Sequence, residues 1–349
     1  MAQGRARGIF NDKRAILARC MYWSGGHFLS NFLPAQNSLL VLVYHRIGNA
    51  WEDLYDPGVF SAADDEFDDQ LKYLKKNFAL VGLDEARAWV TEPRKEDSRC
   101  RVLVTFDDGY LDNYQVAFPI LRSHGVPGVF FLSTSLVGSS EVPWWDEIAF
   151  LIRTTRRPEF SLSYPSDLTV NIARDGLARS IRRVIDHYKR PQNTAPSRFL
   201  CELREAIQGD DLPMPKRRFL DWDEAKEMIK GGMTIGSHCH SHQMLSKLSV
   251  DQQQFEMIQS RSLLRDRLGS DIASLAYPVG IKGSFSDETQ AAARTAGYTV
   301  AFSYDGGVNL SKRPLNPYDV KRVGVSTTQD RVRFRVQAGI SRFTGKFWP

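Results

Sequence analysis

The sequence predicts an α/β protein that folds as a deformed, incomplete (β/α)7 barrel. Seven apolar, strand-like segments occur along the chain, most are followed by a helix-like segment, and polar residues stand directly after several strands. Regular strand–helix alternation predicts a parallel sheet. Seven strands fit an incomplete barrel better than an open sheet. In such barrels the rim at the carboxyl ends of the strands is the active-site face.

Each element is predicted from its hydrophobic pattern and its end signals. The run "NSLLVLVYH" (37–45) is continuously apolar, which is typical of a buried parallel strand. The helix 221–232 has Asp221 as its N-cap and Gly231 beyond its end. The other predicted strands are 101–109, 126–135, 233–238, 272–278, 298–304 and 318–325. The other predicted helices are 64–77, 113–125, 177–189, 197–208, 249–268 and 286–296.

The chain divides into a central body and two basic ends. The barrel is expected over 38–329, with an insertion at about 138–220 that is mixed in character. Residues 1–37 and 330–349 each carry five Lys or Arg and one Asp, or +4, which leaves 5 − 8 = −3 for the body. Both ends also contain aromatic residues, so they suit either contact with an anionic membrane surface or solvated termini. The second of the two ends, 330–349, is expected to be a basic C-terminal tail.

The composition indicates a cytoplasmic protein, with peripheral contact at the inner face of the membrane as a further expectation. Four scattered cysteines form no CxxC pair, which favours reduced thiols. The first residues contain no continuous apolar stretch of the secretory type, and no run of about 18 apolar residues exists. Nucleic acid is not expected as a partner, because the body has no basic stripe.

Three histidines at alternate positions, in "SHCHSH", suggest a metal site. On a strand, His238, His240 and His242 would share one face, whereas on a helix only His238 and His242 would. The spacing alone therefore allows a site with two or with three histidines, and Cys239 is a further possible ligand.

The motif "TFDDGY" places two adjacent carboxylates, Asp107 and Asp108, at the end of a predicted buried strand. Adjacent residues point in different directions there, so one can bind a metal while the other stays free as a base. An ordinary Asp-Asp-Gly turn explains the composition equally well. Together with His238 and His242, however, one aspartate completes a three-ligand hydrolytic zinc site that keeps a position open for water.

In order, the motifs "TFDDGY", "GSHCHSHQMLSKLS" and "LAYPVG" resemble those of the polysaccharide deacetylase family, which is carbohydrate esterase family four or the chitooligosaccharide deacetylase homology domain. The likeness extends over about 38–325. It implies a deformed barrel of about seven β/α units. It also implies hydrolysis of N- or O-acetyl groups on sugars with one divalent metal ion, commonly zinc.

The resemblance assigns roles to individual residues. Asp107 corresponds to the catalytic base, and Asp108, His238 and His242 correspond to the metal ligands. The two histidines belong to a His-x-x-x-His element on a helical turn, so His240 should point away from the metal. The backbone N–H of Tyr110 corresponds to a donor to the tetrahedral oxyanion.

The sequence departs from the family pattern at the catalytic acid. No histidine follows His242, Ala276 stands where an arginine usually orients the base, and "YDGGVN" replaces an Asp-Trp motif. The chain is therefore either a divergent member with a relocated acid or an inactive one. A relocated acid is favoured. His45, on the rim, is expected to be this acid or a substrate contact, and the alternative is that it is a histidine of the core. Arg322 is expected to brace Asp107.

Three further residues are expected near the substrate. Trp145, in "VPWWDEIAF", could stack on a sugar ring, although packing of the inserted segment explains a Trp pair slightly better. Tyr277 and Pro278 lie beside the predicted metal rim.

The expected function is metal-dependent removal of an acetyl group, foremost N-acetyl, from a carbohydrate. The expected partner is an acetylated oligosaccharide, polysaccharide or lipid-linked sugar, and the expected setting is polysaccharide or glycolipid biosynthesis. One alternative is a hydrolase of another non-peptide C–N bond. The other is an inactive, glycan-binding barrel.

Overall fold

A computed structural model describes residues 36–50, 52–92, 99–190, 192–207, 217–311 and 315–344. Its main sheet has the strand order β11-β10-β9-β6-β5-β1-β12, with β13 paired to β1 and β4 paired to β5. Every pairing in it is parallel except that between β1 and β12. The strands are β1 (Ser38–Tyr44), β4 (Ala79–Leu80), β5 (Cys100–Phe106), β6 (Gly128–Leu132), β9 (Thr234–Ser237), β10 (Ser274–Ala276), β11 (Val300–Phe302), β12 (Asn309–Leu310) and β13 (Val323–Gly324).

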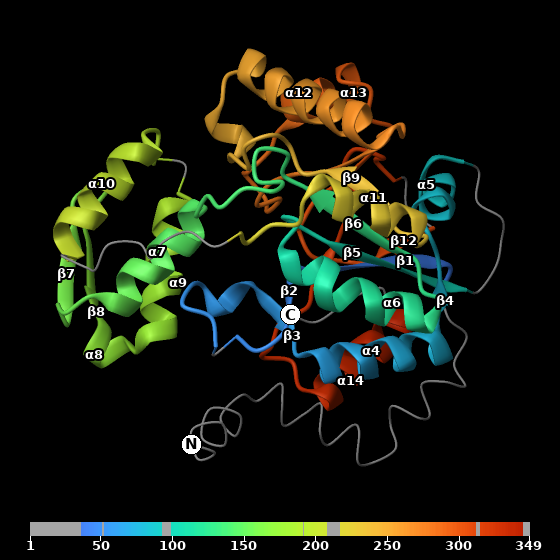
Figure 1. The fold of residues 1–349 in the computed structure, drawn as a ribbon, viewed down its shortest axis with the longest axis horizontal. Coiled ribbons are helices and arrows are strands. Elements are labelled where there is room, and N and C mark those ends of the chain that lie inside the picture. Colours follow the sequence, from blue (N-terminus) through green and yellow to red (C-terminus); the bar gives the residue numbers. More distant parts are fainter. Residues whose placement is uncertain are drawn as a thin grey trace.

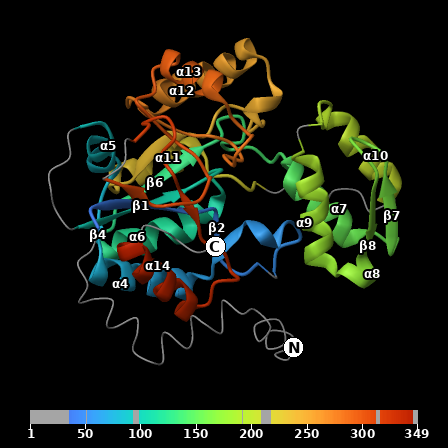
Figure 2. The same ribbon diagram turned by 180° about the vertical axis from the view of Figure 1, so that it is seen from behind.

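The sheet curls into a half-barrel with helices on its outside, which confirms the predicted incomplete barrel. Figure 1 shows α12 and α13 above the sheet and α4, α6 and α14 below it, and Figure 2 shows the same arrangement from behind. All seven predicted strands are present, as β1, β5, β6, β9, β10, β11 and β13. The helical segments around the barrel are η2 (Pro57–Val59), α4 (Asp64–Asn77), α5 (Leu83–Thr91), η3 (Asn113–Ala117), α6 (Phe118–His124), α11 (Trp222–Lys230), η4 (Leu245–Lys247), α12 (Val250–Leu268), α13 (Asp287–Thr295) and α14 (Arg331–Thr344).

Strands β1 and β5 are adjacent strands of seven residues each, and their register positions the site. Every residue of both strands is buried, as expected for continuous apolar runs in a parallel sheet. Tyr44 pairs with Phe106, and the backbone N–H of Asp107 donates to the carbonyl of Tyr44 at 3.0 Å. The residues that follow the two strands, His45 and Asp107, are therefore neighbours on the rim.

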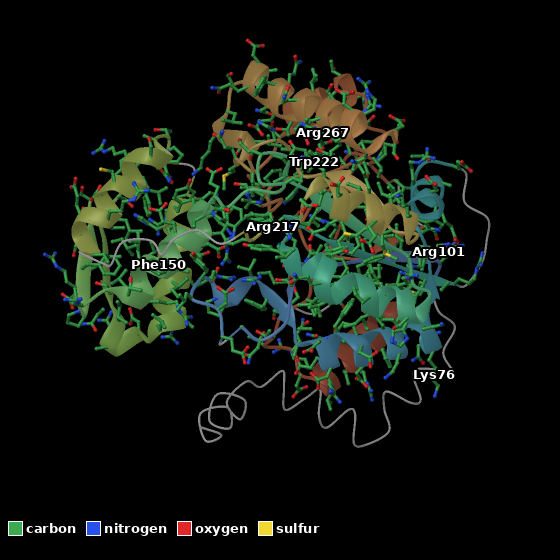
Figure 3. All side chains as sticks on the ribbon, viewed as in Figure 1. Lys76, Arg101, Phe150, Arg217, Trp222 and Arg267 are labelled. Carbon is green, nitrogen blue, oxygen red and sulfur yellow. The ribbon has the colours of Figure 1, made fainter. Side chains whose placement is uncertain are left out.

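Helix α11 leads the chain toward β9 and starts at the predicted cap. The carboxylate of Asp221 accepts hydrogen bonds from the backbone N–H groups of Asp223 and Glu224, which satisfies two of the unpaired donors of the first turn. Trp222 lies at this start, and the guanidinium of Arg267 on α12 is 5.9 Å from the centre of its ring (Figure 3).

The insertion forms a separate small lobe beside the barrel (Figure 1). Its apolar side chains make a core of their own, which also includes Tyr110, Leu136 and Phe219 from outside its helices and strands. The predicted helices 177–189 and 197–208 correspond to α9 and α10. The lobe consists of α7 (Trp144–Thr154), β7 (Glu159–Leu162), β8 (Leu168–Asn171), α8 (Ile172–Asp175), α9 (Leu177–Tyr188) and α10 (Pro196–Ile207).

Helix α7 was not predicted. All eight residues from Trp145 to Ile152 are buried, and these include the carboxylates of Asp146 and Glu147. A small parallel pair, β2 (Arg46–Ile47) with β3 (Phe60–Ala62), lies between this lobe and the helices below the sheet (Figure 1).

The prediction of a C-terminal tail at 330–349 is wrong for the part of it that the structure describes. Helix α14 packs on α4 with Phe334 and Ala338 fully buried. Arg331 and Arg335 pair with the α4 carboxylates of Asp65 and Asp69 at 2.6 and 2.7 Å. These two arginines are therefore paired with acidic side chains of α4 and do not form an unopposed basic surface.

The prediction for the other end, 1–37, lies almost wholly outside the described residues. Among the helices that the structure describes, none combines the length and the apolar character needed to cross a membrane.

Candidate functional site

The turn after β5 separates two neighbouring carboxylates. Asp108 and Gly109 both adopt left-handed backbone angles, with φ of 72° and 79°. A Cβ atom at Gly109 would lie 2.7 Å from a methyl carbon of Leu132, so glycine satisfies both the backbone angle and the close approach. A left-handed aspartate is uncommon, and such conformations concentrate at functional sites. The turn thus directs Asp107 and Asp108 to different partners.

The histidine loop follows β9 and is not a helical turn, which corrects the expectation drawn from the family. Residues 238–244 form bends and irregular chain before η4, and Cys239 and His242 have φ of 62° and 54°. These two left-handed residues bring His242 back toward His238, with ring centres 4.8 Å apart. The geometry of this loop therefore places the two imidazoles side by side.

Glu256 on α12 holds this loop, and the sequence analysis missed it. Its buried carboxylate accepts hydrogen bonds from the backbone N–H groups of His240 and Ser241, at 2.9 and 2.8 Å, and from the Ser241 hydroxyl at 2.5 Å. A single glutamate on a largely polar helix carries no sequence signal for such a role. The His240 ring meets the hydroxyl of Thr134 at 2.9 Å, and His240 is not part of the ligand group.

Asp108, His238 and His242 form a buried group whose ligand atoms lie within 4.8 Å of one another. Oδ1 of Asp108 is 3.2 Å from Nε2 of His242 and 3.5 Å from Nε2 of His238. Metal–ligand bonds of about 2.0–2.1 Å at tetrahedral angles separate ligand atoms by about 3.3 Å. Oδ1 of Asp108 is buried and has no hydrogen-bond partner among the described residues, which is costly for a carboxylate unless a cation satisfies it. The three residues therefore fit a divalent metal ion.

The environment of His238 prepares it to act as a ligand. Its Nδ1 lies 2.7 Å from the backbone carbonyl of Ala276, which can only accept, so Nδ1 carries the proton and Nε2 offers a lone pair. Burial lowers the pKa of His238 to about 4, although the charge of Asp107 opposes this shift. The imidazole is therefore neutral near pH 7. The "LAYPVG" motif thus contributes a backbone carbonyl at Ala276, the position where the family has an arginine.

Asp107 lies beside this group and pairs with Arg322. Two parallel hydrogen bonds of 2.8 Å join the guanidinium nitrogens to the two carboxylate oxygens, and both side chains are buried. Burial by itself would raise the pKa of Asp107, but Arg322, and then His238, outweigh it and hold that pKa below its ordinary value. The structure therefore places Arg322 where the sequence analysis expected it.

His45 is half-buried at the end of β1. It is among the charged groups that lower the pKa values of Asp107 and Asp108, after the larger effects of burial, Arg322 and His242. Its ring meets the ring of Tyr304 edge-on, with centres 6.3 Å apart. The sequence analysis did not identify Tyr304, which lies in the "YDGGVN" segment.

The side chains of Tyr110 and Trp145 pack together beside the metal-ligand group, next to His242. The Trp145 ring centre is 4.4 Å from that of His242. The Trp145 Nε1–H donates to the Tyr110 hydroxyl at 2.7 Å, and this hydroxyl donates to Asp146 at 3.1 Å. The buried Tyr110 side chain therefore supports Trp145 from behind. Trp144 instead stacks on Tyr188, with ring centres 4.2 Å apart.

The backbone on both sides of Tyr110 is paired with the segment 218–220, and the oxyanion contact of its N–H stays a prediction. Leu111 and Leu220 donate the two hydrogen bonds that flank this residue, to the carbonyls of Arg218 and Gly109. These two hydrogen bonds pair Tyr110 with Phe219 in an antiparallel bridge, and the N–H of Tyr110 makes neither of them.

The structure does not bring Tyr277 and Pro278 into the group. The Tyr277 side chain is fully buried, stacks on Phe285 and donates its hydroxyl to the carbonyl of Tyr318 at 3.0 Å. This placement is that of a core residue, whose side chain offers no exposed surface to a substrate. Pro278 begins a buried turn that reaches Gly280, whose carbonyl accepts from the N–H of Tyr304 at 2.7 Å.

The comparisons with known proteins agree on one family. The model of the polysaccharide deacetylase family matches residues 94–301, more than half of the chain. A curated relative, YxkH of Bacillus subtilis strain 168, is described as a polysaccharide deacetylase. It is 25% identical over 316 residues, which cover 90% of this chain and 80% of the relative.

Solved structures show the same fold. IcaB from Ammonifex degensii superposes with a TM-score of 0.56 at 20% identity, over 87% of this chain and 98% of that one. The deacetylase PplD of Streptococcus pyogenes, solved with acetate, gives a TM-score of 0.55 at 17% identity, over 85% and 96% of the two chains.

Proposed function

Because this chain belongs to the polysaccharide deacetylase family, we propose that it removes an N-acetyl group from a carbohydrate with a divalent metal ion bound at Asp108, His238 and His242. A carboxylate and two neutral imidazoles are a ligand set that suits zinc and leaves a position open. When bound, the metal ion polarises the acetyl carbonyl and lowers the pKa of the attacking water.

Asp107 is the general base in this proposal. Arg322 fixes both carboxylate oxygens and keeps the group ionised, so that Asp107 can take a proton from the water as it attacks. Its lowered pKa keeps Asp107 ionised, which is the state in which a carboxylate can accept a proton. The N–H of Tyr110 donates to the developing oxyanion.

His45 is the proton donor to the leaving amine in this proposal. It stands on the rim beside Asp107, and the chain has no histidine after His242. An imidazole on the active-site face is a side chain that can act as a general acid toward a leaving amine. A His45→Ala variant with unchanged turnover would remove this residue from the mechanism.

One observation carries the proposal. The carboxylate of Asp107, which is paired with Arg322 and is not one of the three ligands, is held ionised beside a buried carboxylate–imidazole group that fits a metal ion. A barrel that only binds glycans has no use for this second, braced aspartate. The geometry thus favours the hydrolase over the inactive alternative.

The test measures acetate release from a panel of N-acetylglucosamine pentamers, β-1,4- and β-1,6-linked, together with acetylated xylan and lipid-linked acetylated sugars. The purified full chain should release acetate from at least one, and Asp107→Asn should reduce release by about 100-fold or more. Metal analysis should find about one zinc ion per chain. If the chain hydrolyses cyclic amides but none of the acetylated glycans, the result would support the alternative, a hydrolase of another C–N bond.

The cellular role is part of the proposal. We place the enzyme in the cytoplasm, at the inner face of the membrane, acting in the assembly of a polysaccharide or glycolipid. The basic, aromatic segment 1–37 supports this placement by its composition. Co-sedimentation with anionic liposomes should be weaker for a chain that lacks residues 1–33, and equal binding would overturn the membrane contact.

A further inference from the structure

Tyr304 occupies a slot that exists only because residue 324 is glycine. Gly324 lies on β13, paired with Val43 of β1. A Cβ atom at Gly324 would overlap the Tyr304 hydroxyl oxygen and would lie 2.6 Å from Cζ of the same ring. No side chain larger than hydrogen can therefore stand at 324 while Tyr304 keeps its position. The tyrosine thus crosses from the end of β11 to β13 and rests its hydroxyl against the backbone.

The slot lies beside the proposed base. Arg322 is two residues before Gly324, so the two positions face the same side of β13, and Arg322 holds Asp107 there. The ring of His45 packs edge-on against Tyr304. The Tyr304 side chain therefore lies near the charges of Arg322 and Asp107 and against the ring of His45. The metal-ligand group of Asp108, His238 and His242 is the neighbouring part of the site.

The Tyr304 hydroxyl is a hydrogen-bond donor for which the described part of the chain supplies no acceptor. The residue is half-buried, and among the described residues its oxygen makes no hydrogen bond. Burial, together with the nearby charge of Asp107, raises the pKa of Tyr304 although Arg322 opposes this. The phenol consequently keeps its proton at neutral pH and can donate it to an acceptor on a substrate.

We propose that Tyr304 is a substrate-contacting residue whose hydroxyl, positioned by the slot at Gly324, donates a hydrogen bond to the sugar on the leaving-group side of the acetyl. This inference rests on the proposed deacetylase function and adds a determinant of sugar binding to it. The acetyl group itself belongs at the ligand side, next to Asp108. Tyr304 therefore contacts the sugar, which is the part of the substrate that a simple acetate ester lacks.

The test compares two substrates, an N-acetylglucosamine pentamer and 4-nitrophenyl acetate. Tyr304→Phe removes only the hydroxyl, and Gly324→Ala displaces the hydroxyl while leaving it chemically intact. Each should reduce kcat/KM for the pentamer by about 3- to 10-fold, the effect of one neutral hydrogen bond, and should leave turnover of the aryl acetate unchanged. The double variant should be no worse than the more impaired single variant, because both changes act on one contact.

Matched controls are Tyr114→Phe and Gly82→Ala. The Tyr114 hydroxyl binds Glu227 away from the site, and a Cβ at Gly82 would meet nothing closer than 3.8 Å. Neither control should change either activity.

Three outcomes would contradict the inference. Equal pentamer turnover by the wild type and Tyr304→Phe would overturn the contact alone. Equal losses on both substrates would show that Tyr304 only supports the general structure of the site. A wild type that hydrolyses the aryl acetate but neither the β-1,4- nor the β-1,6-linked pentamer would overturn the proposed function, and this inference with it.

Discussion

Arg322 and Asp107 lie 215 residues apart in the chain and are joined by two parallel hydrogen bonds of 2.8 Å. Arg322 stands directly before β13, which pairs with β1, and Asp107 directly follows β5. A segment near the end of the chain therefore braces the carboxylate in the turn after β5. A planar guanidinium matches both carboxylate oxygens at once, which a lysine cannot do.

Arg322→Lys should shift the acidic limb of the pH–rate profile to higher pH. Arg322 holds the pKa of Asp107 down, and Asp107 must be ionised to act as a base, so a weaker partner raises the pH at which activity appears. We expect kcat to fall about 10-fold, since the carboxylate also loses its orientation. The profile is measured as initial acetate release from pH 4 to 9, and an unchanged limb would contradict the role of the pair.

The same substitution should lower stability in a pH-dependent way. The folded pKa of Asp107 is depressed, so this carboxylate stabilises the fold fully above its unfolded pKa of about 3.9, and the contribution is lost as the pH falls through the folded pKa. Denaturant unfolding should show the wild type and Arg322→Lys differing most near pH 7 and converging in acid.

The metal site should distinguish between the three histidines. His238→Ala and His242→Ala should each lose bound zinc, because each removes one of the three ligands found among the described residues. His240→Ala should keep zinc, because its ring contacts Thr134 instead. Metal content after dialysis is the measurement, and loss of zinc from His240→Ala would contradict the proposed ligand set.

Glu256→Ala should weaken metal binding without removing a ligand. The carboxylate accepts three hydrogen bonds from the loop that carries His242, so its loss releases the loop from its position. A fall of about 10- to 100-fold in zinc affinity is typical when a supporting group of this kind is lost. Competition with a chromophoric chelator measures the affinity, and Glu288→Ala, at an exposed position on α13, serves as the control.

Gly109→Ala should destabilise the protein more than Gly125→Ala. Both glycines have left-handed angles, φ of 79° and 62°, so both substitutions add backbone strain of about 1 kcal/mol. Only Gly109 has a side chain in the way, with Leu132 at 2.7 Å, whereas a Cβ at Gly125 meets nothing within 4 Å. The difference in free energy of unfolding therefore isolates the clash, and equal losses would refute it.

The sequence was sufficient for the barrel and for the residues of the ligand group. Continuous apolar runs predicted β1 and β5. The motifs "TFDDGY" and "SHCHSH" supplied the candidate ligands, and the family that they resemble selected Asp108, His238 and His242 among them. These features are local, since strand length, turn chemistry and ligand type are properties of a few neighbouring residues. The carboxyl ends of parallel strands then meet at one rim whatever the details of packing.

Tertiary structure alone decided the contacts between distant segments. The support of His238 by the Ala276 carbonyl, the anchoring of the loop by Glu256 and the slot at Gly324 have no local pattern, because each depends on which strand or helix lies next to which. The same holds for α14, whose alternating arginines suggest a free basic tail until Asp65 and Asp69 of α4 lie opposite them. Composition determines which groups are available for chemistry, and packing over long sequence separations determines which of them meet.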